Sequence, residues 1–147
     1  MNKLRIISGT YCFDARFETD AAPKTVTVFK KLLPYENKLI HVRWSGEAVW
    51  IPLGEYDFGL TFENHTSYPA PGQMIFYPGG ISETEILLAY GGVRFASKMG
   101  QLAGNHFITI TSGLDRLTEL CNSTKRLSTI SLRHKRAHRF AVIAHQY

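Results

Sequence analysis

The side chains that could carry out acid–base chemistry lie in the middle of the chain, between residues 44 and 110. His106 stands in an expected strand, and because an unperturbed histidine changes charge near neutral pH, it is the candidate general acid or base. Glu85 is the second catalytic candidate, because it shares one face of a strand with Glu83, where like charges raise one of the two pKa values. The alternatives are a histidine at a sheet rim with a backbone partner, and two glutamates that both face solvent.

The same region holds polar and aromatic side chains suited to binding a ligand. Ligand pockets are largely apolar and carry a few convergent polar groups. An arginine fork, offered by Arg94 and by Arg43, clamps a carboxylate, and aromatic rings form walls. Each type also has a structural alternative, since aromatics fill cores, asparagines close turns and arginines pair with glutamates. The candidate ligand-binding residues are Arg94, Tyr90, Trp44, Glu47, Asn64, Tyr77, Phe95 and Asn105.

Several kinds of chemistry have no motif in this sequence. It contains neither a GxGxxG nor a GxxxxGK[ST] phosphate loop, and its serines do not stand in a GxSxG elbow. His41, His65 and His106 lack metal-ligand spacing. We therefore expect no cofactor and no metal. Cys12 and Cys121 form no CxxC motif, which is typical of reduced thiols in the cytoplasm.

The charge is divided unevenly along the 147 residues, a length that fits one domain. The net charge is +5, but six of the 17 basic residues follow Glu119, the last acid, so the 11 that remain face 12 acids, a net of −1. A basic tail could touch an anionic surface, whereas the body has no basic stripe, so nucleic acid is not an expected partner. No apolar run is long enough for a membrane span or a secretory signal, and we expect a cytoplasmic protein.

Short strands separated by turn residues must position these side chains. Residues 3–8 and 11–17 are expected to form a hairpin. A helix is expected from Pro23 to about Leu33, capped by Asp20 and ended by Pro34, and a second helix from Leu114 to about Cys121, capped by Ser112. Many short strands at this spacing favour a barrel or a sandwich. The further strands are expected at 39–44, 48–53, 60–63, 74–77, 86–90 and 105–111, with candidates around Leu127, Ile130 and Leu132 and at 140–144.

The central block resembles a bacterial family known as DUF3830, a domain of unknown function with a cyclophilin-like barrel. The resemblance covers about residues 4 to 120 and rests on long strings in order. They include Trp44-Ser45-Gly46-Glu47-Ala48, Tyr77-Pro78-Gly79-Gly80, Phe95-Ala96-Ser97-Lys98-Met99-Gly100 and Gly104-Asn105-His106-Phe107. The resemblance implies a closed β-barrel of about eight strands with two helices. The stretch Gly104-Asn105-His106-Phe107-Ile108-Thr109 is similar to a strand at the proline pocket of true cyclophilins, but the Phe-x-x-Gln run of those isomerases is absent.

The sequence therefore predicts a mainly β, cyclophilin-like barrel over residues 1–121 and a divergent basic segment over 122–147, which either completes the barrel or extends from it. The expected function is binding or transforming a small polar or amide-bearing organic molecule at the barrel mouth. Two alternatives stay open, a peptidyl-prolyl isomerase-like protein and a non-enzymatic module that assembles into a homo-oligomer. Fold alone does not decide among them.

Overall fold

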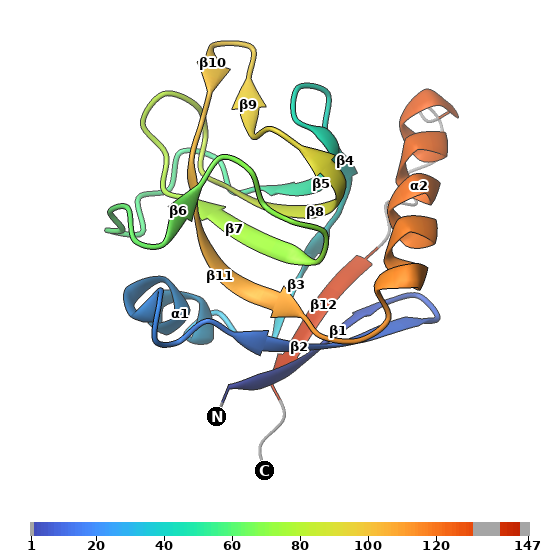
Figure 1. Cartoon of the computed structure of the whole chain (residues 1–147), viewed down its shortest axis with the longest axis horizontal. Coiled ribbons are helices and arrows are strands. Elements are labelled where there is room, and N and C mark those ends of the chain that lie inside the picture. Colours follow the sequence, from blue (N-terminus) through green and yellow to red (C-terminus); the bar gives the residue numbers. More distant parts are fainter. Residues whose placement is uncertain (1, 131–138, 145–147) are drawn as a thin grey trace.

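The computed structural model describes residues 2–130 and 139–144 (Figure 1). Along the chain the elements are β1 (Lys3–Ser8), β2 (Tyr11–Phe17), α1 (Pro23–Lys30), β3 (Tyr35–Lys38), β4 (Ile40–His41), β5 (Gly46–Pro52), β6 (His65–Thr66), β7 (Gln73–Tyr77), β8 (Glu85–Val93), β9 (Ala96–Ser97), β10 (Gly100–Gln101), β11 (Gly104–Ile110), α2 (Leu114–Ile130) and β12 (Arg139–Ala144).

The main sheet is antiparallel and curls into a barrel. Its strands are ordered β3-β12-β1-β2-β11-β7-β8-β5-β4, and β6 pairs with β11 outside this path. The two ends of the path, β3 and β4, are separated in the chain by Leu39 alone, which is buried. The backbone therefore closes the sheet, and β3 with β4 acts as one bent strand shared between β12 and β5. Counted in this way, eight strands surround the core, which confirms the predicted fold class.

The hairpin predicted at the start of the chain is present. β1 and β2 pair antiparallel from Lys3 opposite Arg16 to Ser8 opposite Tyr11. β12 lies on the other side of β1, with Leu4 opposite Ala144, and its second edge pairs with β3. Because both edges of β12 are occupied, this strand offers no free edge to another molecule.

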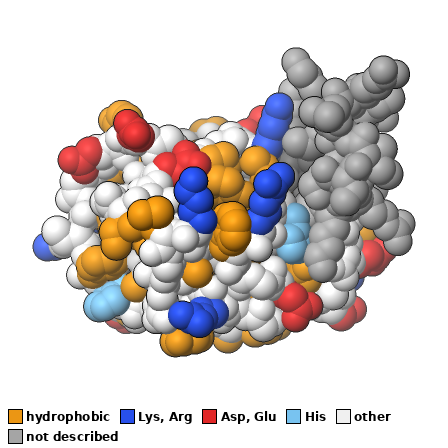
Figure 2. Space-filling model, turned by 90° about the horizontal axis from the view of Figure 1, so that it is seen from above, with side chains coloured by type: hydrophobic (Ala, Val, Ile, Leu, Met, Phe, Trp, Pro, Cys, Tyr) orange, Lys and Arg blue, Asp and Glu red, His pale blue; other side chains and the backbone are white. Residues whose placement is uncertain are grey.

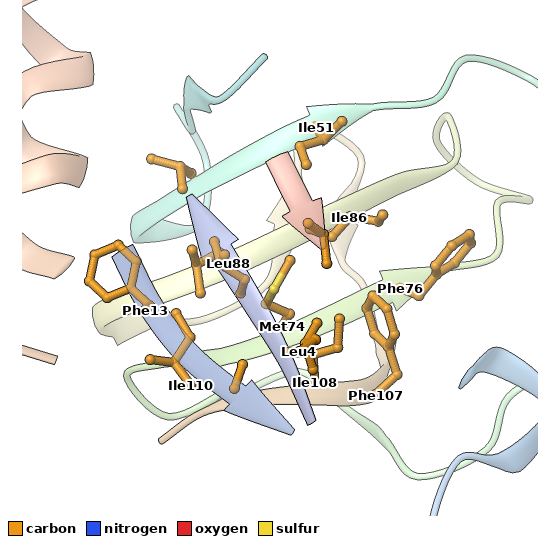
Figure 3. Close-up of a cluster of buried hydrophobic side chains, with 14 of the residues drawn as sticks. Leu4, Phe13, Ile51, Met74, Phe76, Ile86, Leu88, Phe107, Ile108 and Ile110 are labelled. Atoms are coloured by element: carbon orange, nitrogen blue, oxygen red, sulfur yellow. The ribbon is translucent and has the colours of Figure 1, made fainter. Parts of the chain in front are cut away.

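The barrel interior is filled by the larger of two hydrophobic clusters. Side chains from facing strands meet there, as Figure 3 shows for Leu4, Phe13, Met74, Leu88 and Ile108. These residues are at most 2% exposed. Close-packed apolar side chains therefore fill the inside of the barrel.

The two helices lie on different sides of the barrel (Figure 1). In α2, Leu117, Leu120, Cys121 and Thr124 are buried, which is the i, i+3, i+4, i+7 spacing of one helical face. In α1, Val26 and Phe29 are buried, and Phe29 packs edge-on against Phe107 with ring centroids 5.2 Å apart. Among the residues described, no helix is long and apolar enough to cross a membrane.

Several predicted boundaries were wrong. Residues 60–63 form no strand but part of a loop, and helix α1 ends at Lys30 before a hydrogen-bonded turn. The second helix runs to Ile130 because residues 122–130 contain neither glycine nor proline to stop it, so Leu127 and Ile130 lie in a helix. Leu132, and the tail residues Arg133, Lys135 and Arg136, fall outside the described residues.

The cap predicted for α1 was also wrong. Its N-cap residue is Ala22, which makes no side-chain cap, instead of Asp20. A carboxylate oxygen of Glu63, far away in sequence, accepts hydrogen bonds from Thr25 N–H at 2.6 Å and from its hydroxyl at 2.8 Å. A distant acid thus satisfies a free N–H of the first helical turn and complements the helix dipole.

Candidate functional site

A cavity of about 440 Å³ lies against the outer face of the barrel wall, beside β4, β5 and β8. Its second wall is the segment that carries β9. The lining combines aromatic, cationic and acidic side chains. The lining residues are Ile40, His41, Val42, Arg43, Trp44, Ser45, Trp50, Ser82, Glu83, Glu85, Ala96, Ser97 and Lys98.

Strand alternation decides which side chains face this cavity. In β8, Ile86, Leu88 and Tyr90 belong to the barrel core, while Leu87 belongs to the second cluster outside the barrel. Glu85 has the parity of Leu87 and therefore points outward. Trp50 in β5 stands opposite Leu87, so that it faces the same side.

The segment from Arg94 to Leu102 is fastened to the barrel at Ser45. The Ser45 hydroxyl donates to the carbonyl of Ala96 and accepts from its N–H, both at 3.0 Å. The backbone N–H of Arg94 donates to the Ser45 carbonyl at 3.1 Å. Phe95 is fully buried in the second cluster, where it packs against Tyr77. These contacts hold the second wall of the cavity in place.

Glu85 is the unusual group of the cavity. It is 8% exposed, and in the part of the chain that the structure describes no hydrogen bond or ion pair reaches its carboxyl group. Burial, with a further contribution from the charge of Glu83, raises the pKa of Glu85 to about 8. At pH 7 the group is therefore mainly a neutral carboxylic acid, which can donate a hydrogen bond into the cavity.

Cationic and aromatic side chains form the rim. Arg43 and Lys98 are exposed, and Trp44 is 60% exposed. Figure 2 looks down on this face of the molecule and shows hydrophobic side chains gathered near its middle with Lys and Arg side chains beside them. The cavity thus offers an aromatic wall, positive charge at its edge and one buried hydrogen-bond donor.

Tyr90 and His41 connect the barrel wall to α2. The Nδ1 atom of His41 is 2.8 Å from the carbonyl of Val42, to which it donates, and Nε2 lies 2.6 Å from the Tyr90 hydroxyl. The same hydroxyl lies 3.3 Å from Oδ1 of Asn122 in α2. Burial, helped by Cys121 and Glu47, raises the pKa of Tyr90 to about 12, so the phenol keeps its proton. Tyr90 itself does not line the cavity.

His106 belongs to a separate network. Its Nε2 atom is 2.8 Å from the Thr109 hydroxyl, which donates to Glu18 at 2.6 Å, and Arg16 pairs with the same carboxylate at 3.2 Å. Burial lowers the pKa of His106, although Glu18 and the backbone of Ile108 act in the opposite direction. Burial alone would raise the pKa of Glu18, but the Thr109 hydrogen bond and the charge of Arg16 outweigh it and lower that pKa.

The two asparagines hold loops. Asn105 is fully buried, accepts from the N–H of Glu63 at 3.1 Å, and donates to the Thr25 hydroxyl at 3.1 Å and to the Thr61 carbonyl at 2.9 Å. Asn64, with φ of 47°, donates to the carbonyl of His106 at 2.9 Å. Left-handed backbone is a conformation that asparagine tolerates better than most residues.

The remaining candidates are spread over the same half of the molecule. Tyr77 is buried, and its hydroxyl accepts from the N–H groups of Ile81 and Ser82 at 3.1 and 3.3 Å. The Arg94 side chain is exposed and does not line the cavity. Of the ten predicted site residues, Glu85 and Trp44 come together at the cavity. Trp50, His41 and Lys98 were missed, although the alternation of strand 48–53 already placed Trp50 on the face opposite to Val49 and Ile51.

Glu47 packs over a glycine of β8 and accepts from the N–H of Gly92 at 3.1 Å. A Cβ atom at Gly91 would lie 2.6 Å from Cδ and 2.9 Å from Cβ of Glu47, whereas one at Gly92 would come no closer than 3.8 Å to this side chain. We expect Gly91→Ala to lower the free energy of unfolding by about 1–3 kcal/mol, as overpacking usually does. Gly92→Ala is the matched control, with an expected change within about 1 kcal/mol. Urea unfolding measures both, and equal effects would contradict the close approach of Glu47 to Gly91.

Comparisons with known proteins place the chain among cyclophilin-like folds. The profile of the family described as "Protein of unknown function (DUF3830)" matches residues 4–133. A search of curated proteins finds no match. McbB, solved in complex with tryptophan, has a TM-score of 0.71 at 14% identity over 98% of this chain, which spans only 45% of McbB.

The chain is also similar to a cyclophilin-type peptidyl-prolyl cis-trans isomerase of Cryptosporidium parvum, with a TM-score of 0.56 and 12% identity. The alignment covers 99% of this chain and 98% of the isomerase. The same isomerase with the dipeptide Ala-Pro gives a TM-score of 0.52. At these identities the likeness is one of fold.

Proposed function

Because the chain belongs to the DUF3830 family, whose description assigns no function, we propose a function from the lining of the cavity. The protein binds a small organic molecule that carries a carboxylate or amide beside an apolar or aromatic part. The observation that carries this proposal is Glu85, a buried carboxyl group that lines the cavity without a hydrogen-bond partner in the described chain. In its neutral form this group has an O–H that can donate a hydrogen bond to a bound carbonyl or carboxylate.

The rest of the lining fits the same chemistry. Trp44 and Trp50 offer aromatic surface for an apolar ring or chain, and Arg43 and Lys98 supply positive charge for an anionic group. The volume of about 440 Å³ lies within the range of small-molecule sites. McbB, a neighbour in fold, was solved with tryptophan, which combines a carboxylate with an aromatic ring, so tryptophan belongs among the probes.

Intrinsic fluorescence tests this proposal directly, because both tryptophans of the chain line the cavity. We expect small carboxylic acids and amides without an indole, such as phenylacetate, phenylacetamide and hydantoin, to change the tryptophan emission and raise the melting temperature. Calorimetry replaces fluorescence for tryptophan itself. A flat response to every compound in purified folded protein would overturn the proposal.

A pair of exposed aromatic residues provides the matched variants. Trp44, 60% exposed, lines the cavity, whereas Tyr68, 62% exposed, does not. Loss of one aromatic contact is expected to weaken binding about three- to tenfold in Trp44→Ala, because such contacts contribute about 0.5–1.5 kcal/mol. Tyr68→Ala should leave the dissociation constant unchanged. Equal weakening in both variants would mean that binding occurs elsewhere.

Peptidyl-prolyl isomerisation is the second candidate, and the fold favours it because the similarity spans almost the whole isomerase chain. β11 contains residues 104–109, the stretch that is similar to a strand of the isomerase pocket, and His106 in it is half-buried. A proline-peptide assay distinguishes this candidate. If protein that binds the small acids does not raise the isomerisation rate above that of the uncatalysed reaction, isomerisation is ruled out and small-molecule binding is retained.

A further inference from the structure

A second hollow adjoins the cavity of the proposed function. It has a volume of about 530 Å³, and the two share Ser82 and Glu83 in their linings. The second hollow is bounded by the loop that carries Glu55 and Asp57 and by the loop from Pro78 to Glu83. The two hollows are therefore neighbours on the outside of the barrel, with Ser82 and Glu83 between them, and together they are called the groove below.

The two ends of this groove carry opposite charge. Among the described residues, the charged side chains that line the second hollow are those of Glu55, Asp57 and Glu83, all acidic. The far end of the first cavity has Arg43 and Lys98 instead, and its buried acid, Glu85, is mainly protonated at pH 7. Within the described chain, these acids do not converge with other ligands as a metal site, which favours an organic cation at this end.

Exposed apolar side chains lie at both ends of the groove. Ile40 and Trp44 at the cationic end are 39% and 60% exposed, and Tyr56 and Ile81 at the acidic end are 65% and 67% exposed. Single exposed apolar residues are ordinary, but four that line one groove mark a binding surface. They would contact the apolar chain of a bound molecule on either side of Ser82 and Glu83.

The acidic end is held in shape by hydrogen bonds. Thr84 donates through its hydroxyl to the Tyr56 carbonyl at 3.0 Å and through its N–H to the Gly54 carbonyl at 2.8 Å. The Tyr77 hydroxyl fixes the opposite loop through Ile81 and Ser82. Both loops are thus positioned before any ligand arrives, which reduces the entropy lost on binding.

We propose that this groove binds an extended zwitterion, a molecule with a carboxylate and an ammonium group held apart by an apolar chain. The carboxylate lies at Arg43 and Lys98 and near the Glu85 carboxyl group, and the ammonium lies at Glu55 and Asp57. The proposal rests on the proposed function, because it assigns the same cavity to one end of the ligand.

A series of straight-chain ω-amino acids tests it. In buffer of low ionic strength, where exposed charges are least screened, ω-aminooctanoate should bind more tightly than ω-aminobutanoate, because the proposal requires a chain long enough to place one charge at each end of the groove. It should also bind more tightly than octanoate, which lacks the ammonium group. Tryptophan emission and calorimetry give the dissociation constants.

One double variant and a control test the acidic end of the groove. The double variant Glu55→Gln, Asp57→Asn should weaken ω-aminooctanoate about three- to tenfold and leave octanoate unchanged or slightly tighter, as expected for two exposed charge pairs. Asn in place of Asp57 keeps the acceptor for the Gly59 N–H, which lies 2.7 Å away. Glu36→Gln, an exposed acid in β3 that lines neither hollow, is the control.

The outcomes distinguish the two proposals. If octanoate binds and ω-aminooctanoate binds no better, or if the double variant weakens both equally, the zwitterion is wrong and the carboxylate site stands. If neither compound binds at any length, both proposals fail. If ω-aminooctanoate binds more tightly than octanoate, and only the double variant Glu55→Gln, Asp57→Asn removes this difference, both proposals are supported.

Discussion

Replacing Asn105 by alanine is expected to lower the free energy of unfolding by about 3–5 kcal/mol, because three hydrogen bonds are lost and their buried partners stay unpaired. The fully buried amide links α1 through Thr25 to the loop through Glu63 and Thr61. The Thr25 hydroxyl also donates to the carboxylate of Glu63, which satisfies the first turn of α1, so the loss should extend to the helix start. Urea unfolding, monitored by far-ultraviolet circular dichroism, gives the difference.

Asn64→Ala is the matched control for this variant. The Asn64 amide makes one exposed hydrogen bond, to the carbonyl of His106, so we expect a loss of about 1 kcal/mol, including the cost of a left-handed backbone at alanine. Hydrogen exchange should show faster opening of the α1 amides in Asn105→Ala than in Asn64→Ala. Similar losses in the two variants would contradict the role of Asn105 as a buried junction.

Glu85→Gln is expected to stabilise the protein by about 2–4 kcal/mol at pH 8 and to have little effect near pH 4. The unfolded carboxyl group ionises near its ordinary pKa of 4.5, whereas the folded one ionises at about 8. Between these values the folded state holds a proton that the unfolded state has released. The stability of the wild-type protein therefore falls as pH rises through this window, by up to about 1.4 kcal/mol per pH unit, and glutamine removes this dependence.

Urea unfolding at half-unit steps from pH 4 to pH 9 measures this effect. Glu83→Gln is the control, because Glu83 is exposed and contributes the smaller part of the Glu85 shift. It should stabilise slightly at pH 8 and keep most of the wild-type pH dependence. Parallel pH profiles of wild type and Glu85→Gln would mean that the Glu85 carboxyl group is not held in a desolvated place.

The hairpin and the central strands could be predicted because local signals coincide there. In β2, buried and exposed residues alternate in step with the sequence, and Gly9 turns the chain with φ of 59°. The loop at 60–63 was misjudged because an apolar run of this length looks the same in a strand and in a packed loop. The length of α2 was underestimated because the residues after Cys121 show no clear hydrophobic periodicity, so the end of the helix could not be located in the sequence.

The candidate site was predicted only in part, for a different reason. Glu85 and Trp44 were found because a carboxylate beside an apolar run and an aromatic at a turn are local signals. The residues that meet them, Trp50 and Lys98, come from strands and turns that are neighbours only after the barrel has formed. Asn105 was predicted to bind a ligand because the sequence does not show that its amide makes three hydrogen bonds within the protein.

The position of β12 determines when the barrel can form during synthesis. β12 lies between β1 and β3, and it pairs Leu4 with Ala144. A nascent chain that has not yet delivered residues 139–144 leaves the facing edges of β1 and β3 without their partner strand, and such edges attract other chains. Barrel closure therefore waits for residues 139–144, and it joins residues nearly the whole described chain apart, a separation at which contacts form slowly. The interval between emergence of the first hairpin and closure is the period in which a chaperone would act on this protein.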